Sequence, residues 1–154
     1  TSDSGLFLVI RTADCLPIVL VDREAGVCAA LHSGWRGSYQ NILLRGIETM
    51  ESLGACRQHI TGWIGPSICM ENYEVGRELA ERFAEAYGRL GSFLEGRRLD
   101  LPKLVKLQSR AAGLRPDALS YCGLCTYRRS DLFHSHRRQG TLKGHQFTLA
   151  GLLS

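Results

Sequence analysis

The run LFLVIRTADCLPIVLVDREAGVCAALH, residues 6–32, contains the strongest indication of the fold in this chain of 154 residues. Its apolar and β-branched residues form three strand-length stretches: 6–12 (LFLVIRT), 17–22 (PIVLVD) and 27–32 (VCAALH). A short turn that contains Gly26 separates the second stretch from the third, which predicts an antiparallel hairpin. Because strands that are so continuously apolar are usually covered on both faces, we expect helices to pack on this sheet.

Beyond the hairpin, apolar residues recur at helical spacing in three segments. We expect helices over 38–53, where Ser38 can cap the start, over 74–90, and from Pro102 to near Gly113. Short strands are expected at residues 60–64, 118–122 and 145–149, with an irregular stretch at 94–100. This order predicts an α+β (mixed α/β) fold, in which helices cover a mixed β-sheet that contains an antiparallel hairpin.

Composition indicates one globular enzyme-sized domain over residues 1–154, with 44% hydrophobic and 22% charged residues. The formal charge of +4 is scattered, so we expect no nucleic-acid partner, although it favours an anionic substrate. No apolar run approaches the roughly eighteen residues of a membrane span, and no signal peptide is evident, so no membrane partner is expected. Because the chain starts at Thr1 and runs at once into a strand, we expect the domain to lack an N-terminal part. Composition leaves the oligomeric state open.

The six cysteines point to a reducing, cytoplasmic setting, because a chain of this size has enough core to fold without cross-links. Cys28 and Cys56 are expected to be free thiols. Cys122 and Cys125 form a single CxxC pair with no second pair to complete a structural zinc site, so we expect them to hold no metal.

Cys15 and His32 are the main candidates for chemistry. Cys15 precedes the first strand of the hairpin and His32 ends the second, so both should lie near the same edge of the sheet. A thiol and an imidazole there are half of a zinc or copper site, or a nucleophile and its base. They are equally a buried cysteine and a hydrogen-bonded histidine, because cysteine is among the most buried residue types. Spacing alone leaves these alternatives open.

Two basic segments are candidates for anion binding. Arg36 lies in the glycine-flanked loop SGWRG (33–37), directly before a helix start that favours anions. Arg137 and Arg138 end the polar stretch HSHRR (134–138), and a guanidinium pair there could form an anion-binding wall. The alternative for the first segment is a loop followed by a helix cap.

Five motifs occur together and in order: TADCLPIVL (12–20), LHSGWRG (31–37), IGPSICMENYEVG (64–76), LDL (99–101) and CTYRRSDLFHSHRRQG (125–140). On these motifs the chain resembles the laccase-domain family, described as multicopper polyphenol oxidoreductases and later as purine nucleoside phosphorylases with adenosine deaminase activity. The resemblance implies that Cys15 and His32 bind one metal, usually zinc, together with a further His upstream of Thr1. The last motif departs from the usual FFSYRR and GR, since this chain has His134, His136 and His145 there.

The resemblance therefore implies a zinc-dependent purine nucleoside phosphorylase with adenosine deaminase activity, which acts on a purine nucleoside and phosphate. In deamination a zinc-held water would attack C6 of adenine. Asp14, Cys15 and His32 are the expected catalytic residues, with Asp14 in proton transfer because it adjoins a ligand. Arg36 and Arg138 are expected to hold phosphate.

Three other functions remain open at this level. A copper-dependent polyphenol oxidase of the laccase type would need many histidines for a four-copper cluster, and the chain has 5 in all. One Cys and two His could make a single copper site. A hydrolase could use Cys15 as nucleophile and His32 as base. A catalytically inactive partner-binding domain would follow from an incomplete metal site.

Overall fold

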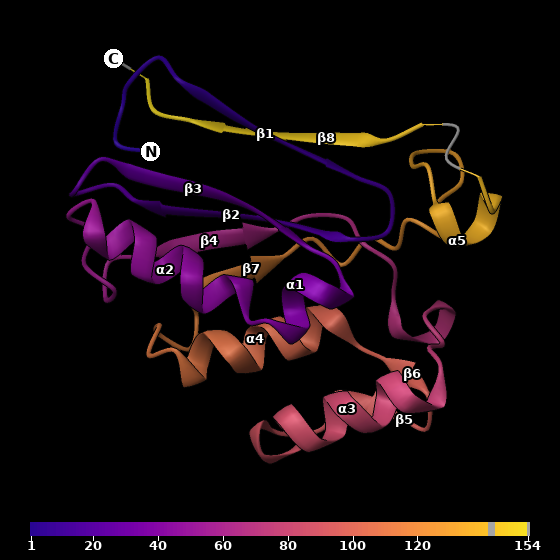
Figure 1. Ribbon diagram of the computed structural model, residues 1–154. Coiled ribbons are helices and arrows are strands. Elements are labelled where there is room, and N and C mark those ends of the chain that lie inside the picture. The colour runs from indigo at the N-terminus through magenta and orange to yellow at the C-terminus, as the bar shows by residue number, and fades with distance from the viewer. Residues whose placement is uncertain (142–143, 154) are drawn as a thin grey trace.

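A computed structural model describes residues 1–141 and 144–153, and a four-stranded mixed sheet lies at its centre (Figure 1). The strand order is β3-β2-β4-β7. The four strands are β2 (Leu16–Asp22), β3 (Val27–Ser33), β4 (Thr61–Ile64) and β7 (Leu119–Tyr121). Strand β2 pairs antiparallel with both β3 and β4, whereas β4 pairs parallel with β7. The predicted mixed sheet with an antiparallel hairpin is therefore confirmed.

The β2–β3 hairpin brings its two functional ends together. Pro17 lies opposite His32 and Leu16 lies opposite Ser33 in the register. Cys15 directly precedes β2, so it lies at the end of the sheet where β3 finishes. The expected strands at 17–22 and 27–32 agree with the observed bounds to within one residue.

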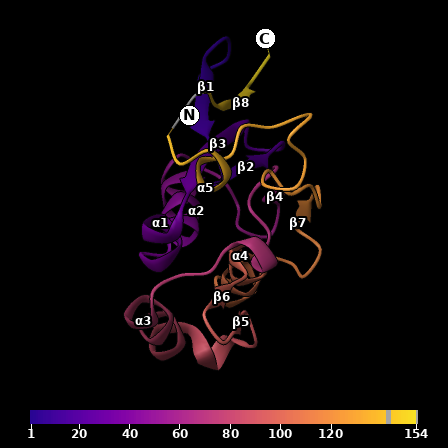
Figure 2. The same cartoon turned by 90° about the vertical axis from the view of Figure 1, so that its right-hand side faces the viewer.

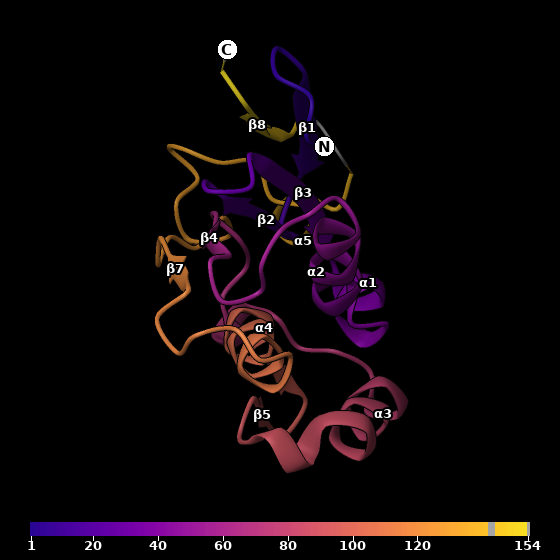
Figure 3. The ribbon, with the colours of Figure 1, turned by 90° about the vertical axis from the view of Figure 1, so that its left-hand side faces the viewer.

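A separate two-stranded ribbon joins the two ends of the chain. Strand β1 (Phe7–Thr12) pairs antiparallel with β8 (Gln146–Gly151), and Val9 lies opposite Leu149. The ribbon lies on the β3 side of the sheet, away from the helices, with both termini at its far end (Figures 1 and 3). Because β1 leads straight into Cys15, and the segment before β8 carries His145, the ribbon brings both ends of the chain to one place.

The helix predicted over 38–53 is in fact two helices. Helix α1 (Trp35–Tyr39) and helix α2 (Ile42–Ser52) are separated at Asn41, which adopts a left-handed φ of 52° and accepts a hydrogen bond from Leu44 N at 3.4 Å. Ser38 does not cap a helix start. It is buried inside α1, and its Oγ lies 2.8 Å from Ser33 Oγ, a hydrogen bond that ties the helix to the end of β3.

The helix predicted from Pro102 to near Gly113 agrees with the structure to within two residues, whereas the helix predicted over 74–90 is shorter. Asp100 accepts a hydrogen bond from Lys103 N at 2.9 Å and starts α4, which has Pro102 in its first turn. The helix expected from residue 74 starts three residues later, because Glu74 pairs with Arg98 in an isolated bridge. The remaining elements are η1 (Met70–Asn72), α3 (Arg77–Tyr87), η2 (Gly88–Leu90), β5 (Leu94–Glu95), β6 (Arg98–Leu99), α4 (Leu101–Ala111) and α5 (His136–Gln139).

Helices α1, α2 and α4 cover one face of the sheet, and α3 packs with the β5–β6 hairpin beyond α4 (Figures 1 and 2). Leu16, Ile18 and Leu20 of β2 are fully buried against these helices. The expectation of cover on both faces is wrong, because Val19 on the opposite face is only partly buried and its neighbour Trp63 is 40% exposed. Within the described part of the chain, no helix is long and apolar enough to cross a membrane.

Candidate active site

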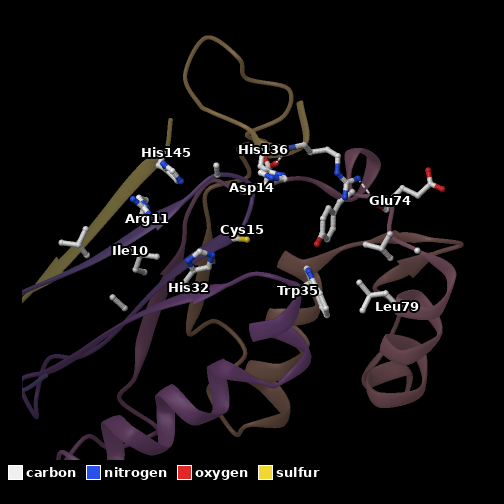
Figure 4. A pocket seen from close by; sticks show the side chains of 17 residues that line it. Ile10, Arg11, Asp14, Cys15, His32, Trp35, Glu74, Leu79, His136 and His145 are labelled. Carbon is white, nitrogen blue, oxygen red and sulfur yellow. Dashed lines mark hydrogen bonds between the residues drawn. The ribbon is translucent and has the colours of Figure 1, made fainter. Parts of the chain in front are cut away.

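A cavity of about 880 Å³ opens at the end of the sheet where β2 starts and β3 finishes. Its walls come from β1, the segment between β1 and β2, the end of β3, α1, the start of α3 with the segment before it, and α5 (Figure 4). Segments from both ends of the chain therefore meet around one space. Among the predicted residues, Asp14, Cys15, His32 and Arg137 line it.

Cys15 and His32 face a common point beside Gly34. A methyl group added at Gly34 would lie 2.7 Å from Cys15 Sγ and 4.0 Å from His32 Nε2. The two atoms are thus separated by no more than the sum of these distances, and Figure 4 shows the sulfur and the imidazole ring side by side in the cavity wall. The sequence therefore has glycine at a position where a side chain would press on Cys15.

The surroundings of Cys15 and His32 favour the neutral form of both groups. Burial raises the pKa of the Cys15 thiol, and the neighbouring Asp14 carboxylate raises it further. Partial burial of the ring lowers the pKa of His32, so the imidazole is neutral at pH 7 with one nitrogen lone pair available. A metal ion that binds here must displace the Cys15 proton, because the thiolate is the ligand form.

Asp14 connects three segments around the cavity. Its buried carboxylate accepts a 2.6 Å hydrogen bond from Thr126 Oγ1 and a 2.7 Å bond from the backbone nitrogen of Arg137 in α5. Its backbone oxygen accepts from Ile68 N at 2.9 Å. The residue has a φ of 87°, a conformation that costs on the order of 1–3 kcal/mol in a non-glycine residue and persists where surrounding contacts hold it.

The two predicted phosphate-binding arginines lie outside the cavity wall. Arg138 donates to the backbone oxygens of Thr126, Tyr127 and Phe133, each at 2.7 Å, so its guanidinium holds the 126–133 loop. Arg36 is exposed and stacks on its neighbour Trp35, with 4.2 Å from Cζ to the ring centroid. The directions of these side chains depend on tertiary contacts that the sequence motifs do not reveal.

Arg137, the other arginine expected in an anion-binding wall, lines the cavity together with further basic residues. Arg11 of β1 and Arg137 of α5 contribute guanidinium groups, and His136 and His145 contribute imidazoles. Arg137 also stacks over the ring of Tyr73 at 5.1 Å and donates to the backbone oxygen of Glu74. The cavity is therefore lined by several groups that favour an anion.

Tyr73 is the functional candidate that sequence reasoning missed. Burial raises the pKa of its phenol to about 12, and the nearby Cys15 thiol contributes to that increase. The hydroxyl therefore stays protonated at neutral pH and can donate a hydrogen bond into the cavity. Nothing in the local sequence pattern separates it from an ordinary loop tyrosine, because its relation to Cys15 arises only in the folded chain.

The donor set suits one metal ion and leaves ligand positions to be filled. A thiolate and an imidazole are ligands that zinc and copper both accept. Across residues 1–141 and 144–153, no group of three or more His, Cys, Asp or Glu side chains is arranged to hold a metal. Cys15 and His32 thus fit part of the coordination sphere of one metal ion. The described residues do not form a site for several metal ions.

Comparison with known proteins gives consistent results. The family model described as multi-copper polyphenol oxidoreductase laccase matches residues 1–153. The chain is 38% identical to a purine nucleoside phosphorylase of Deinococcus radiodurans, over 99% of this chain and 59% of that protein. It is 35% identical to adenosine deaminase RL5 from an unknown prokaryotic organism, over 94% of this chain and 56% of that protein. The crystal structure of YlmD from Geobacillus stearothermophilus superposes on this chain with a TM-score of 0.89 and 26% sequence identity. The match covers 99% of this chain and 59% of YlmD. The chain thus spans less than two thirds of the length of each of these proteins.

Proposed function

The chain belongs to the multi-copper polyphenol oxidoreductase laccase family, and from that premise we propose that it is a metal-dependent purine nucleoside phosphorylase that also deaminates adenosine. One relative named purine nucleoside phosphorylase and another named adenosine deaminase each match almost the whole chain. The observation that supports the proposal most strongly is that Cys15 Sγ and His32 Nε2 both lie close to Gly34 in the wall of the cavity.

Cys15 and His32 are the residues that hold the metal in this proposal. When bound, the ion supplies a Lewis acid that lowers the pKa of a bound water toward neutrality. Zinc suits a thiolate and a neutral imidazole in this way, and copper is the alternative. The third protein ligand, in this proposal, comes from polypeptide outside residues 1–154.

In this proposal Asp14 moves a proton. Thr126 and the Arg137 amide each occupy one lone pair on different carboxylate oxygens, so each oxygen keeps a second lone pair for a proton. The two hydrogen bonds also fix the carboxylate in one orientation, as a general base requires. Thr126 therefore acts as a positioning residue for Asp14.

The remaining walls suit the two parts of a nucleoside and its phosphate partner. Trp35 and Leu79 offer apolar surface to a flat purine base. Arg11 and Arg137 offer guanidinium groups to phosphate, in place of Arg36 and Arg138. Tyr73 can donate to a base or ribose oxygen, because its phenol stays protonated.

The test compares the purified protein with its Cys15→Ala variant. Each is analysed for bound metal and incubated with inosine plus phosphate and, separately, with adenosine. We expect the unmodified protein to retain zinc, release hypoxanthine from inosine and form inosine from adenosine. The variant should lose both the metal and turnover, because too few protein ligands remain. Cys56→Ser is the matched control, since Cys56 is an exposed free thiol outside the cavity.

Other outcomes separate the alternative functions. Full nucleoside turnover by metal-free Cys15→Ala would overturn the proposal. Bound copper with oxidation of phenols would indicate the polyphenol oxidase instead. Ester or amide hydrolysis without metal, lost in Cys15→Ala, would indicate a Cys15–His32 hydrolase. Absence of any turnover would leave the partner-binding domain.

A further inference from the structure

Two cysteines, Cys69 and Cys125, lie close together where the segment after β4 runs beside the segment after β7. Ser67 and Cys125 form an isolated parallel bridge. The backbone nitrogen of Cys69 donates to Cys125 Sγ at 3.3 Å. Asn72 Nδ2 lies 3.0 Å from Cys69 Sγ and 3.9 Å from Cys125 Sγ, so one amide group contacts both sulfur atoms. The two thiols therefore face each other, although they are 56 positions apart in the chain.

The surroundings make the two thiols unequal. Burial opposes ionisation of Cys125, but hydrogen bonds from the Cys69 thiol and from backbone amides, including those of Arg128 and Tyr127, outweigh it and lower the pKa of Cys125. Burial and the hydrogen bond to Cys125 raise the pKa of Cys69 to about 11. One sulfur is thus favoured as thiolate while its neighbour keeps its proton, an arrangement in which the thiolate reacts first and the neighbour follows.

We propose that Cys69 and Cys125 are a redox-modification site that forms a reversible disulfide when the protein meets a peroxide. The inference does not depend on the proposed nucleoside chemistry. It differs from what the isolated CxxC pattern suggests, because the partner of Cys125 is Cys69 rather than Cys122. The distances that carry it are those from Cys69 N and Asn72 Nδ2 to the two sulfur atoms.

The reaction balances with hydrogen peroxide as the oxidant. The Cys125 thiolate attacks one peroxide oxygen, the O–O bond breaks, and Cys125 becomes a sulfenic acid as hydroxide leaves. The Cys69 sulfur then attacks Cys125 Sγ, the S–O bond breaks, and the departing hydroxide takes the Cys69 proton to form water. Two thiols are oxidised to one disulfide, and the peroxide is reduced to the oxidation level of water.

Access to the pair is suited to a small oxidant. Cys125 is 7% exposed, while Cys69 is partly exposed at the start of η1. Peroxide is close to water in size, so it reaches a nearly buried sulfur more easily than a bulky disulfide does. Cys56 is exposed and has no neighbouring thiol among the hydrogen-bond partners described, so it serves as an internal reference for reaction by exposure alone.

The test is thiol mapping of the reduced protein after brief treatment with a few equivalents of hydrogen peroxide. Remaining thiols are alkylated under denaturing conditions, and the digest is analysed by mass spectrometry. We expect one linked peptide pair, containing Cys69 and Cys125, to form before Cys56 is oxidised and to disappear on treatment with a thiol reductant. Cys28 and Cys56 should remain alkylated.

Two variants test the order of the steps. In Cys69→Ser, Cys125 should stop at the sulfenic acid, which dimedone traps as a stable adduct. In Cys125→Ser, Cys69 should react no faster than Cys56. Cys125 linked to Cys122, or Cys69 and Cys125 both still alkylated after Cys56 has been oxidised, would overturn the proposal. Because the peptide map uses the unmodified protein, it decides the matter even if a variant fails to fold.

Discussion

Gly34 lies beside Cys15 and His32, where a larger residue would press on Cys15. Its φ of −81° suits any residue, so the need for glycine is steric: an added methyl would lie 2.7 Å from Cys15 Sγ. We predict that Gly34→Ala leaves the fold intact but weakens metal binding by roughly 10- to 100-fold, the range seen when ligand positioning is disturbed. Competition with a chromophoric zinc chelator measures the affinity.

The matched control for this prediction is Gly88→Ala. Gly88 has a helical φ of −55°, and an added methyl there meets no atom within 4 Å. This variant should bind metal as tightly as the unmodified protein. Equal zinc affinity in Gly34→Ala and Gly88→Ala would contradict the placement of the metal beside Gly34.

Thr126 provides a second test at this scale, because its hydroxyl donates to the buried carboxylate of Asp14. We predict that Thr126→Val lowers the free energy of unfolding by about 1.5–3 kcal/mol, the usual cost of losing a hydrogen bond to a charged group. Turnover of inosine should fall with it, because Asp14 loses its fixed orientation. Thr126→Ser keeps the hydroxyl and should retain most of the stability and most of the inosine turnover. Equal stability and turnover in Thr126→Val and Thr126→Ser would show that the hydrogen bond to Asp14 does not have this role.

The candidate site could be predicted from the sequence only where neighbours in the chain determine it. The β2–β3 hairpin brings Cys15 and His32 to the same end of the sheet, so their spacing in the sequence indicated that they lie close together. The partner of Asp14 in α5 lies 123 positions away, and no local pattern connects the two. Arg138 illustrates the opposite error: its motif indicated phosphate binding, whereas its guanidinium is occupied by backbone carbonyls.

At the scale of elements, Asp22 ties the β2–β3 turn to the loop after α2. Its fully buried carboxylate accepts hydrogen bonds from the backbone nitrogens of Glu24, Ala25 and Cys56, at 3.0, 3.1 and 2.7 Å. Burial opposes ionisation, but these amides outweigh it and lower the pKa of Asp22. The ionised form is therefore the one that stabilises the fold.

We predict that Asp22→Asn lowers the free energy of unfolding at pH 7 by about 1–3 kcal/mol, because one amide donor then faces another. The stabilisation by Asp22 is present above the pKa of the unfolded state, and it is lost as the pH falls through the lower pKa of the folded state. The difference between the unmodified protein and the variant should therefore shrink at acid pH. Urea unfolding across pH 7 to 3 measures it, and a difference that is constant with pH would contradict the assignment.

Elements with long periodic patterns were predictable, and those shaped by a single residue or by tertiary pairing were not. The hairpin strands and α4 match their expected positions because period and capping agree with the fold. Asn41 breaks a helix whose apolar spacing continues across it, so periodicity alone joined α1 to α2. The short β5–β6 pairing and the four residues of α5 are too brief to leave a periodic pattern.

At the scale of the whole molecule, the topology assembles one cavity from the two ends of the chain. The start of β2 supplies Cys15, the end of β3 supplies His32, and α5 supplies the amide that holds Asp14. The sheet and its helices fix the first two. The position of α5 is fixed by the hydrogen bonds that Arg137 N donates to Asp14 and that Arg138 donates to Thr126 O. The α+β class followed from the sequence, but this closure of the cavity followed only from the structure.

The most direct test of the central claim, that Cys15 and His32 share one metal ion, is zinc K-edge X-ray absorption on the zinc-loaded protein. The account predicts a sulfur neighbour at about 2.3 Å together with nitrogen at about 2.0–2.1 Å. It further predicts that the sulfur shell disappears in Cys15→Ser and persists in Cys56→Ser. A spectrum without sulfur, or a sulfur shell that remains in Cys15→Ser, would contradict it.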